Sequence, residues 1–404
     1  MKRQTTLAEL VTELKDQNLQ KNDFVVPANL LSMENGFLVV NNYNNNDSLT
    51  KLLTEVGIKS EEADNKLILN CLPVLHQHLA EKLDIPRKYY NRLTSLDEKT
   101  LIDTNVSYWL KNMKSNVFLR TFINKDKNEG YARALLSDRY NVIDNFDVLL
   151  ATLEAVKSSG LNLQIEDNGC DLSENKMYLR FIAPDVEINA PDLLKNYRNP
   201  KGNPDGDGGS KVGDGIISGF VITNSEVGQG SFSISPRAVI LKCKNGMVFK
   251  EDAYGKIHLG GKMDNFSAIN WSEDTKRKNY ELIMAQVQDA VKQFTSEDFL
   301  AKKISELNEY ATVELKHPMD TVKNVTKLLN VSEEKERSIL DLFIRGGDFT
   351  PLGVSQALTF YAHETKDADE AHDLEVEAIS ILPKIKSMDV PTVVKSIKTQ
   401  ASLN

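Results

Sequence analysis

The stretch that decides the fold is Tyr131-Ala-Arg-Ala-Leu-Leu-Ser-Asp-Arg-Tyr140, followed by Asn-Val-Ile-Asp-Asn-Phe-Asp-Val-Leu-Leu150. Its first half alternates in polarity. A period of two places Arg133 and Arg139 on one face of a strand and sends Ala132, Ala134 and Leu136 to the other. This pattern predicts a strand with one apolar face and one cationic face. The arginines either face a ligand or are solvent-exposed residues of a structural strand, and spacing alone does not choose.

A helix is expected directly after this strand. Asp144 or Asn145 is the predicted cap, because short polar side chains accept hydrogen bonds from the first free backbone N–H groups of a helix. Apolar residues then recur at helical spacing, at Phe146, Leu149, Leu150 and Leu153. Upstream, the apolar run 117–123 and the turn 124–130 complete a hairpin, so this part of the chain predicts a β-β-α element.

The rest of the chain separates into a mixed region and a helical one. Further strands are predicted near residues 161–165, 177–183, 216–223 and 231–243. Beyond about residue 274 glycine becomes rare and helical periodicity dominates, with a helix start at Ser332. We therefore expect an α+β protein with a central, mostly antiparallel sheet: an N-terminal helix and tether over 1–23, a mixed core over 24–273 and a helical region over 274–404. The C-terminal helices should pack through Leu328, Leu329, Leu340, Phe343 and Ile344.

Composition is that of an ordinary globular protein, with 41% hydrophobic and 26% charged residues in 404. No run approaches the length of a membrane span and the first residues do not resemble a signal peptide, so we expect a cytoplasmic protein, in the host cell if the gene is carried by a phage. Cys71, Cys170 and Cys243 lie far apart, which argues against disulfides and zinc and favours free thiols.

The net charge of −9 argues against a uniformly basic nucleic-acid binder, but two segments carry a local positive excess. Residues 111–140 contain seven Lys and Arg against three acids, and residues 242–278 contain eight against five. A solvated face is the alternative to a binding groove in both segments. The candidate nucleic-acid-binding residues are Arg120, Arg133, Arg139, Tyr140, Lys242, Lys244, His258 and Lys262.

No catalytic constellation is recognisable. The chain lacks a phosphate-binding Gly-x-x-x-x-Gly-Lys loop, a Gly-x-Ser-x-Gly elbow and a His-Glu-x-x-His helix, so we expect no enzyme, no cofactor and no metal. His76 and His78 lie two residues apart in a helical pattern, which does not place them on one face as joint metal ligands. The glycine- and aspartate-rich stretch from Asn199 to Asp214 lacks the order of a calcium loop and is expected to be a flexible hairpin tip.

Several different short motifs follow one another along the chain in a characteristic order. They are Ile85-Pro-Arg-Lys-Tyr-Tyr90, Asn105-Val-Ser-Tyr-Trp-Leu110, Ser137-Asp-Arg-Tyr140 with Ile143-Asp-Asn145, Thr223-Asn-Ser-Glu-Val-Gly228, Cys243-Lys-Asn-Gly-Met247, His258-Leu-Gly260 and Gln356-Ala-Leu-Thr-Phe-Tyr-Ala362. In this order they resemble the family labelled domain of unknown function 932, also called phage/plasmid-like proteins. The resemblance covers roughly residues 24 to 365 and implies a protein of a mobile genetic element.

Two classes of function follow. A hairpin, helix and antiparallel sheet with arginines on one strand resembles, in architecture only, the RecT/Red-beta class of single-strand annealing proteins. Such a protein would bind single-stranded DNA in recombination, annealing or replication, stack bases on aromatics such as Phe122, Tyr131 and Tyr140, and form a homo-oligomer. The alternative is a non-enzymatic modulator of host defence, or an accessory phage protein without nucleic-acid binding, which the acidic net charge favours.

Overall fold

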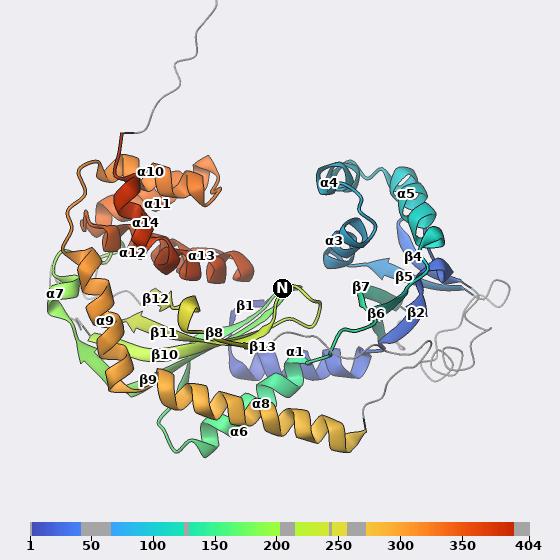
Figure 1. The fold of residues 1–404 in the computed structure, drawn as a ribbon, viewed down its shortest axis with the longest axis horizontal. Coiled ribbons are helices and arrows are strands. Elements are labelled where there is room, and N and C mark those ends of the chain that lie inside the picture. Colours follow the sequence, from blue (N-terminus) through green and yellow to red (C-terminus); the bar gives the residue numbers. More distant parts are fainter. Residues whose placement is uncertain are drawn as a thin grey trace, which may run out of the picture.

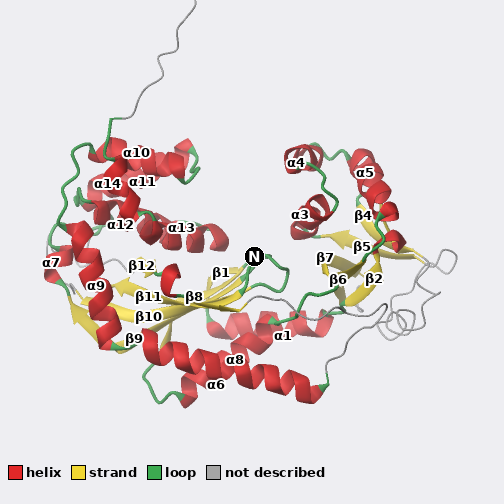
Figure 2. Cartoon of the chain, viewed as in Figure 1, coloured by secondary structure: helices red, strands yellow, loops and turns green. Residues whose placement is uncertain are grey.

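The structure is a computed structural model that describes residues 2–41, 66–124, 129–202, 215–241, 245–256 and 272–391. Two sheets, each with its own helices, form two lobes (Figures 1 and 2). The α+β class predicted from the sequence is confirmed.

Within the described ranges the larger sheet has seven strands, all paired antiparallel, in the order β1-β8-β9-β10-β11-β12, with β13 also paired to β11. Alternation in β11 sends Phe232 and Ile234 to an apolar core on one face of this sheet, where helices cover it. The strands are β1 (Lys2–Thr5), β8 (Gln164–Leu172), β9 (Met177–Asn189), β10 (Gly215–Asn224), β11 (Phe232–Ile240), β12 (Asn245–Val248) and β13 (Tyr254–Lys256).

The smaller sheet has six strands in the order β2-β6-β7-β5-β4-β3, and its only parallel pair among the described residues is β5 with β7. Its strands are β2 (Phe24–Pro27), β3 (Leu31–Glu34), β4 (Phe37–Asn41), β5 (Lys66–Cys71), β6 (Asn116–Asn124) and β7 (Glu129–Ser137), with a short 3₁₀ turn η1 (Ala28–Leu30) between β2 and β3. Three helices pack on it: α3 (Pro73–Lys82), α4 (Arg87–Ser95) and α5 (Lys99–Asn112).

The larger sheet is covered on both faces. Helices α1 (Leu7–Gln20), α6 (Asn145–Ser158) and α8 (Glu273–Phe294) share an apolar core with one face. The C-terminal helices gather over the opposite face and one end of the sheet (Figure 1), and their core includes Ile216 and Ile240 of the strands. The remaining elements are α7 (Pro191–Leu194), η3 (Lys250–Asp252), α9 (Glu297–Ala311), α10 (Pro318–Leu328), α11 (Glu333–Gly346), α12 (Pro351–Glu364), α13 (Ala368–Ser380) and α14 (Leu382–Met388).

The predicted β-β-α element is present as β6, β7 and α6, but the register of its hairpin shifts. Arg120 lies opposite Ala134, and Thr121 lies opposite Ala132, which leaves Arg133 as the extra residue of a β-bulge. A bulge twists its strand and re-aims the side chains that follow. The simple alternation expected for this strand is therefore interrupted at the arginine.

The packing on either side of the bulge shows the consequence. Ala132 and Leu135 pack in the core of the six-stranded sheet, whereas Ala134 and Leu136 pack in a separate small cluster. The strand ends at Ser137, so the second arginine of the pattern belongs to the turn that follows. The prediction of one apolar and one cationic strand face is wrong for this reason.

Two further expectations differ from the structure. The N-terminal segment is not a tether, because β1 pairs with β8 and the buried Leu10 and Leu14 fix α1 on the sheet. In the C-terminal helices Phe343 is buried as expected, whereas Leu328 and Ile344 are about half exposed. The buried faces of α10 and α11 are rotated away from these two residues and contain Val322, Val325, Ile339 and Leu342 instead.

Candidate functional site

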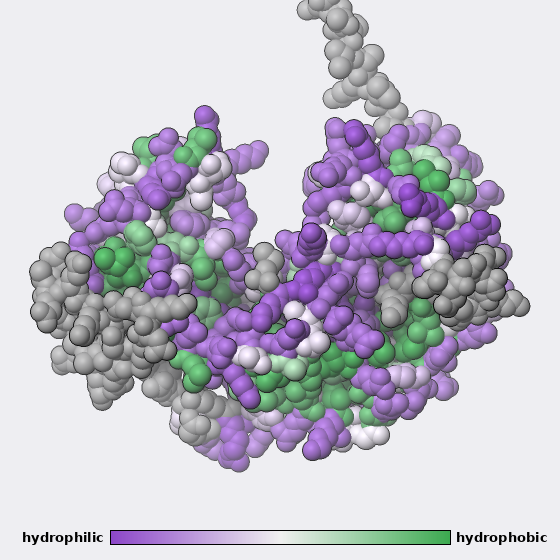
Figure 3. Space-filling model, turned by 180° about the vertical axis from the view of Figure 1, so that it is seen from behind, coloured by the Kyte–Doolittle hydropathy of each residue, from purple (hydrophilic) through white to green (hydrophobic). Residues whose placement is uncertain are grey.

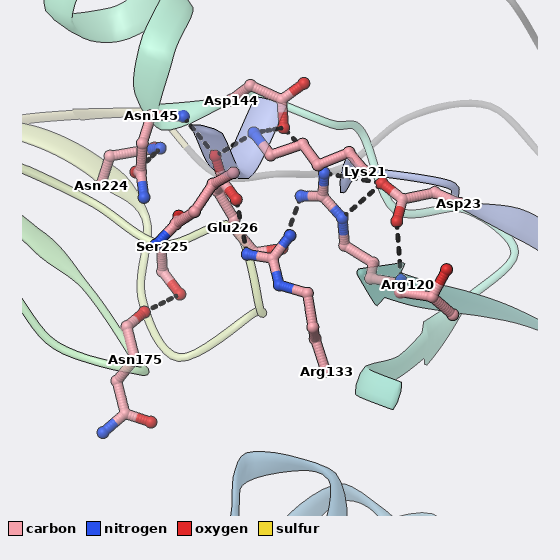
Figure 4. Close-up of polar contacts among 12 residues, drawn as sticks. Lys21, Asp23, Arg120, Arg133, Asp144, Asn145, Asn175, Asn224, Ser225 and Glu226 are labelled. Carbon is pink, nitrogen blue, oxygen red and sulfur yellow. Dashed lines mark hydrogen bonds and ion pairs between the residues drawn. The ribbon is translucent and has the colours of Figure 1, made fainter. Parts of the chain in front are cut away.

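The two arginines of the β6–β7 hairpin lie where the two sheets meet (Figure 4). Arg120 is fully buried and uses all its donor atoms within the protein. Its Nε donates to Asp23 Oδ2 at 2.8 Å, Nη1 to the backbone oxygen of Glu226 at 2.8 Å and Nη2 to Asp144 Oδ1 at 2.7 Å. No nitrogen of this guanidinium is left to contact a phosphate.

Glu226, in the turn after β10, organises the other half of the arrangement. Its Oε2 accepts from Arg133 Nη2 at 2.6 Å, and its Oε1 accepts from Lys21 Nζ at 2.6 Å and from the backbone N–H of Asn145 at 2.7 Å. Lys21 also donates to Asp144 Oδ1 at 3.1 Å. The guanidinium of Arg133 stacks over Phe122, 3.8 Å from the ring centre.

Together these residues form a junction ion cluster with three cations and three carboxylates: Lys21, Asp23, Arg120, Arg133, Asp144 and Glu226. Burial alone would raise the pKa of Glu226, but Lys21, Arg133 and Arg120 hold that pKa well below its usual range. Burial likewise opposes ionisation of Asp144, and Lys21 and Arg120 lower its pKa. The cluster is thus a compensated interior network that joins the two sheets.

The candidate residues predicted from the sequence are distributed unevenly. The structure brings Arg120 and Arg133 together and buries both. Tyr140 is also buried, and its hydroxyl donates to the backbone oxygen of Ser225 at 2.9 Å. Arg139 is exposed in the turn after β7. Four candidates lie outside the described residues: Lys242, Lys244, His258 and Lys262.

The helix predicted after the hairpin begins as expected, with Asp144 at the N-cap position. Its carboxylate makes no capping hydrogen bond, because Lys21 and Arg120 bind it instead. The residue type that signals a helix start therefore serves the junction ion cluster.

Helices α4 and α5 also carry exposed aromatic and cationic side chains. Tyr89 on α4 is 42% exposed, and Tyr108 and Trp109 on α5 are 60% and 48% exposed. The rings of Tyr108 and Trp109 meet edge to face, with centres 5.2 Å apart. The two helices pack against each other, and α4 borders the gap between the lobes (Figure 1).

The local sequence explains why these rings point outward. Tyr90 and Leu93 form the buried face of α4, and the Tyr90 hydroxyl bonds to His76 Nδ1 at 2.9 Å, which leaves Tyr89 on the other side. Ile102, Val106 and Leu110 form the buried stripe of α5. The aromatic residues just before Leu110 consequently project from the exposed side.

Four cations accompany the rings: Lys88, Arg92, Lys111 and Lys114. All four are exposed, and none has a carboxylate within 4 Å among the residues that the structure describes. We call Lys88, Tyr89, Arg92, Tyr108, Trp109, Lys111 and Lys114 the α4–α5 surface. It combines free positive charge with flat apolar rings, the two features that bind an unpaired strand.

Sequence reasoning missed the aromatic members of this surface. Tyr89 and Trp109 stand in two of the quoted motifs, but the expected stacking residues were Phe122, Tyr131 and Tyr140. The available signal was the helical period, since Tyr89 and Tyr108 fall off the apolar stripes of their helices.

The space between the lobes is a real hollow on the molecular surface, and hydrophilic residues dominate its walls and floor (Figure 3). At the lobe junction a cavity of about 270 Å³ has Arg133, Glu226, Lys2 and the turn Ser173–Lys176 in its lining. The same turn borders a second cavity of about 470 Å³ over β11.

In the part of the chain that the structure describes, no group of three or more His, Cys, Asp or Glu side chains could hold a metal ion. Cys71 and Cys170 are free thiols, and burial raises the pKa of Cys71 to about 12; Cys243 lies outside the described residues. None of the described helices combines the length and the apolar character needed to span a bilayer.

Comparison of the chain with protein-family models, with curated proteins and with solved structures found no match. The resemblance to phage/plasmid-like proteins stays a prediction that rests on the quoted motifs.

Proposed function

We propose that this chain binds single-stranded nucleic acid through the α4–α5 surface and serves recombination, strand annealing or replication in a mobile genetic element. The observation that carries the proposal is the exposure, on α4, on α5 and just after α5, of three aromatic rings and of four cations that form no ion pair within the described residues. The sequence motifs of phage/plasmid-like proteins support the setting.

The energetics favour a strand over a duplex on such a surface. Stacking of a base on an exposed ring contributes about 1–3 kcal/mol and is available only where bases are unpaired. Each cation that neutralises a phosphate of a single strand adds about 0.7 to the slope of log affinity against log salt. Four free cations can hold a backbone locally although the whole chain is acidic, because salt screens charges beyond about 10 Å.

This proposal gives Arg120 and Arg133 a structural role. Both are neutralised by carboxylates at the lobe junction, and a phosphate would have to displace Asp23 or Asp144 to reach Arg120. Arg133 binds Glu226 through Nη2, whereas its Nη1 has no hydrogen-bond partner among the described residues. The groove first expected on β7 is thereby replaced by a surface on α4 and α5.

The test is fluorescence anisotropy with a labelled oligothymidylate at several salt concentrations. Trp109→Ala should weaken binding by about tenfold or more, as expected for the loss of one stacked base. Lys111→Ala should lower the salt slope by about 0.7. Lys386→Ala, on the exposed face of α14, is the matched lysine control and should change neither quantity.

Oligomeric state provides a second measurement. Strand-annealing proteins assemble on DNA, so light scattering after size exclusion should show a homo-oligomer that grows when the oligonucleotide is added. Wild-type protein that neither binds the oligonucleotide nor assembles would refute the proposal.

A second candidate function is the modulation of host defence, or an accessory phage role, through contact with a protein. Leu96 and Leu101 are 60% and 45% exposed on the segment that carries the α4–α5 surface. Aromatic residues are enriched in protein interfaces, and clustered exposed apolar residues mark docking sites. Failure of the wild-type protein to bind the oligonucleotide would favour this function.

A further inference from the structure

A cavity of about 470 Å³ lies between β10 and β11 of the larger sheet and α13, far from the α4–α5 surface along the chain. In Figure 1 helix α13 lies over this sheet, with one end near the gap between the lobes. The volume is within the range of small-molecule sites. We call this space the β11–α13 cavity.

Its sheet wall consists of hydroxyl groups. Ser233 and Ser235 alternate along β11 with Phe232 and Ile234, which pack in the core on the other face of the sheet. Thr223 Oγ1 of β10 lies 2.7 Å from Ser233 Oγ, and Ser231 continues the wall. Small polar residues stand where larger apolar ones would have filled the space beneath α13.

Two lysines contribute positive charge to the cavity. Lys176, in the turn between β8 and β9, and Lys250, in η3, both line it. Neither ammonium group has a carboxylate within 4 Å in the described chain. Gly230 makes room for the first of them, because a Cβ at that position would come within 3.0 Å of Lys176 Cε.

The wall of the cavity that α13 forms carries an imidazole and two carboxylates in place of hydroxyl and ammonium groups. His372 is only 9% exposed, lines the cavity, and its Nδ1 has no hydrogen-bond partner. Burial lowers the pKa of His372 to about 3, so the ring is neutral at ordinary pH. Asp373 and Glu377 line the same wall, and burial raises the pKa of Asp373 although Lys176 and Lys250 act against this. A buried unpartnered nitrogen costs stability, and a ligand atom can satisfy it.

The sheet wall and the helix wall of the cavity bind ligand groups of different chemistry. Hydroxyls and ammonium groups bind a compact anion such as phosphate, whereas carboxylates and a neutral imidazole bind hydroxyl or amino donors. Inorganic phosphate alone would satisfy only one wall and would leave most of the volume empty. A ribose phosphate satisfies both.

We propose that the β11–α13 cavity binds a ribose 5-phosphate group, with the phosphomonoester at Lys176, Lys250 and the serine hydroxyls and the sugar hydroxyls at His372 and Asp373. Both a free nucleotide and the 5′-phosphorylated end of a strand carry this group. The cavity shares no residue with the α4–α5 surface, so this site is independent of the proposed function.

The test is isothermal titration of the full chain with ribose 5-phosphate, adenosine monophosphate, adenosine and inorganic phosphate. Ribose 5-phosphate and the nucleotide should bind, adenosine should not, and phosphate should bind at least about tenfold more weakly than ribose 5-phosphate. A 5′-phosphorylated oligonucleotide that binds more tightly than its 5′-hydroxyl form would identify a strand end as the source. Binding of the free nucleotide only would identify a small-molecule site.

Substitutions of residues that line the β11–α13 cavity test whether ribose 5-phosphate binds there. Lys250→Ala and Ser231→Glu should each weaken ribose 5-phosphate binding by about tenfold or more, the second through a carboxylate added to the phosphate wall. Trp109→Ala and Lys386→Ala should leave that binding unchanged. Unchanged binding in both cavity variants, or no binding of ribose 5-phosphate to the wild type, would overturn the inference.

Discussion

Arg120 shows how one side chain can be fixed by its surroundings. Its guanidinium is fully buried, donates to three different partners and lies between Asp23 and Asp144. Burial opposes the charged form, but these two carboxylates and Glu226 hold the pKa of Arg120 well above its usual value. Its charge is therefore permanent, and the network depends on it.

Removing this side chain should be costly. Arg120→Met leaves Asp23 and Asp144 without their shared cation, and breaking a buried ion pair from one side costs about 3–5 kcal/mol. Arg139→Ala, at the exposed arginine 19 residues further on, should change the free energy of unfolding by less than about 0.5 kcal/mol. Urea denaturation of both variants measures the difference. Equal losses would show that the cluster contributes little to stability.

His78 gives the protein a defined pH dependence. It is buried, its Nδ1 accepts a hydrogen bond from the backbone N–H of Leu135 at 3.2 Å, and burial, assisted by Lys82, lowers its pKa to about 4 from 6.5. Between these values the unfolded chain binds a proton that the folded chain does not, so stability falls as pH falls from about 6.5 to about 4. The loss from this residue is on the order of 3 kcal/mol.

The corresponding measurement is the free energy of unfolding as a function of pH. His78→Gln keeps a polar side chain but cannot titrate, so its stability curve should be flatter than that of the wild type in this window. Parallel curves would show that other groups cause the acid sensitivity.

At the scale of elements, helix α11 begins where a short polar side chain predicts. Ser332 is the N-cap residue, and its hydroxyl accepts from the backbone N–H of Lys335. Ser332→Ala should reduce stability by about 1 kcal/mol. Ser338→Ala, within the same helix and exposed, is the matched control and should be neutral or slightly stabilising. Thermal melts of the two variants test this, and a similar melting temperature for both would argue against the cap.

Elements with strong periodicity were predictable from the sequence, and those with long-range constraints were not. The hairpin, α6, the central strands and α11 follow from local pattern and capping residues. The bulge at Arg133 does not, because nothing in the alternation marks the extra residue. β9 also continues to Asn189, well past the apolar run, since β10 pairs with both of its ends across a bulge at residues 184–186.

The junction ion cluster could not be predicted for the same reason. Arg133 and Glu226 are 93 residues apart in sequence, and Arg120 binds a backbone oxygen 106 residues away. Residue spacing reports neighbours along one element and says nothing about partners across two sheets. The arginines were recognisable as notable residues, but whether they face carboxylates or solvent is a property of the whole molecule.

At the scale of the whole molecule, the two lobes have separate apolar cores. Among the described residues, the core of the six-stranded sheet is made by residues between Phe24 and Leu135, and the larger sheet has its own apolar clusters. The junction ion cluster and a small apolar cluster around Phe118 and Val227 join them. Each lobe thus has an apolar core of its own, and polar and apolar contacts at the junction couple the two.

Glu226→Gln tests this coupling. The substitution keeps the shape of the side chain but removes the carboxylate that binds Lys21 and Arg133, so the lobes should unfold less cooperatively. We expect differential scanning calorimetry to show one main transition for the wild type and a broadened or split transition for the variant. Glu174→Gln, at an exposed carboxylate of the neighbouring turn, should behave like the wild type. A single transition of unchanged width in Glu226→Gln would mean that the apolar contacts around Phe118 suffice to hold the lobes together.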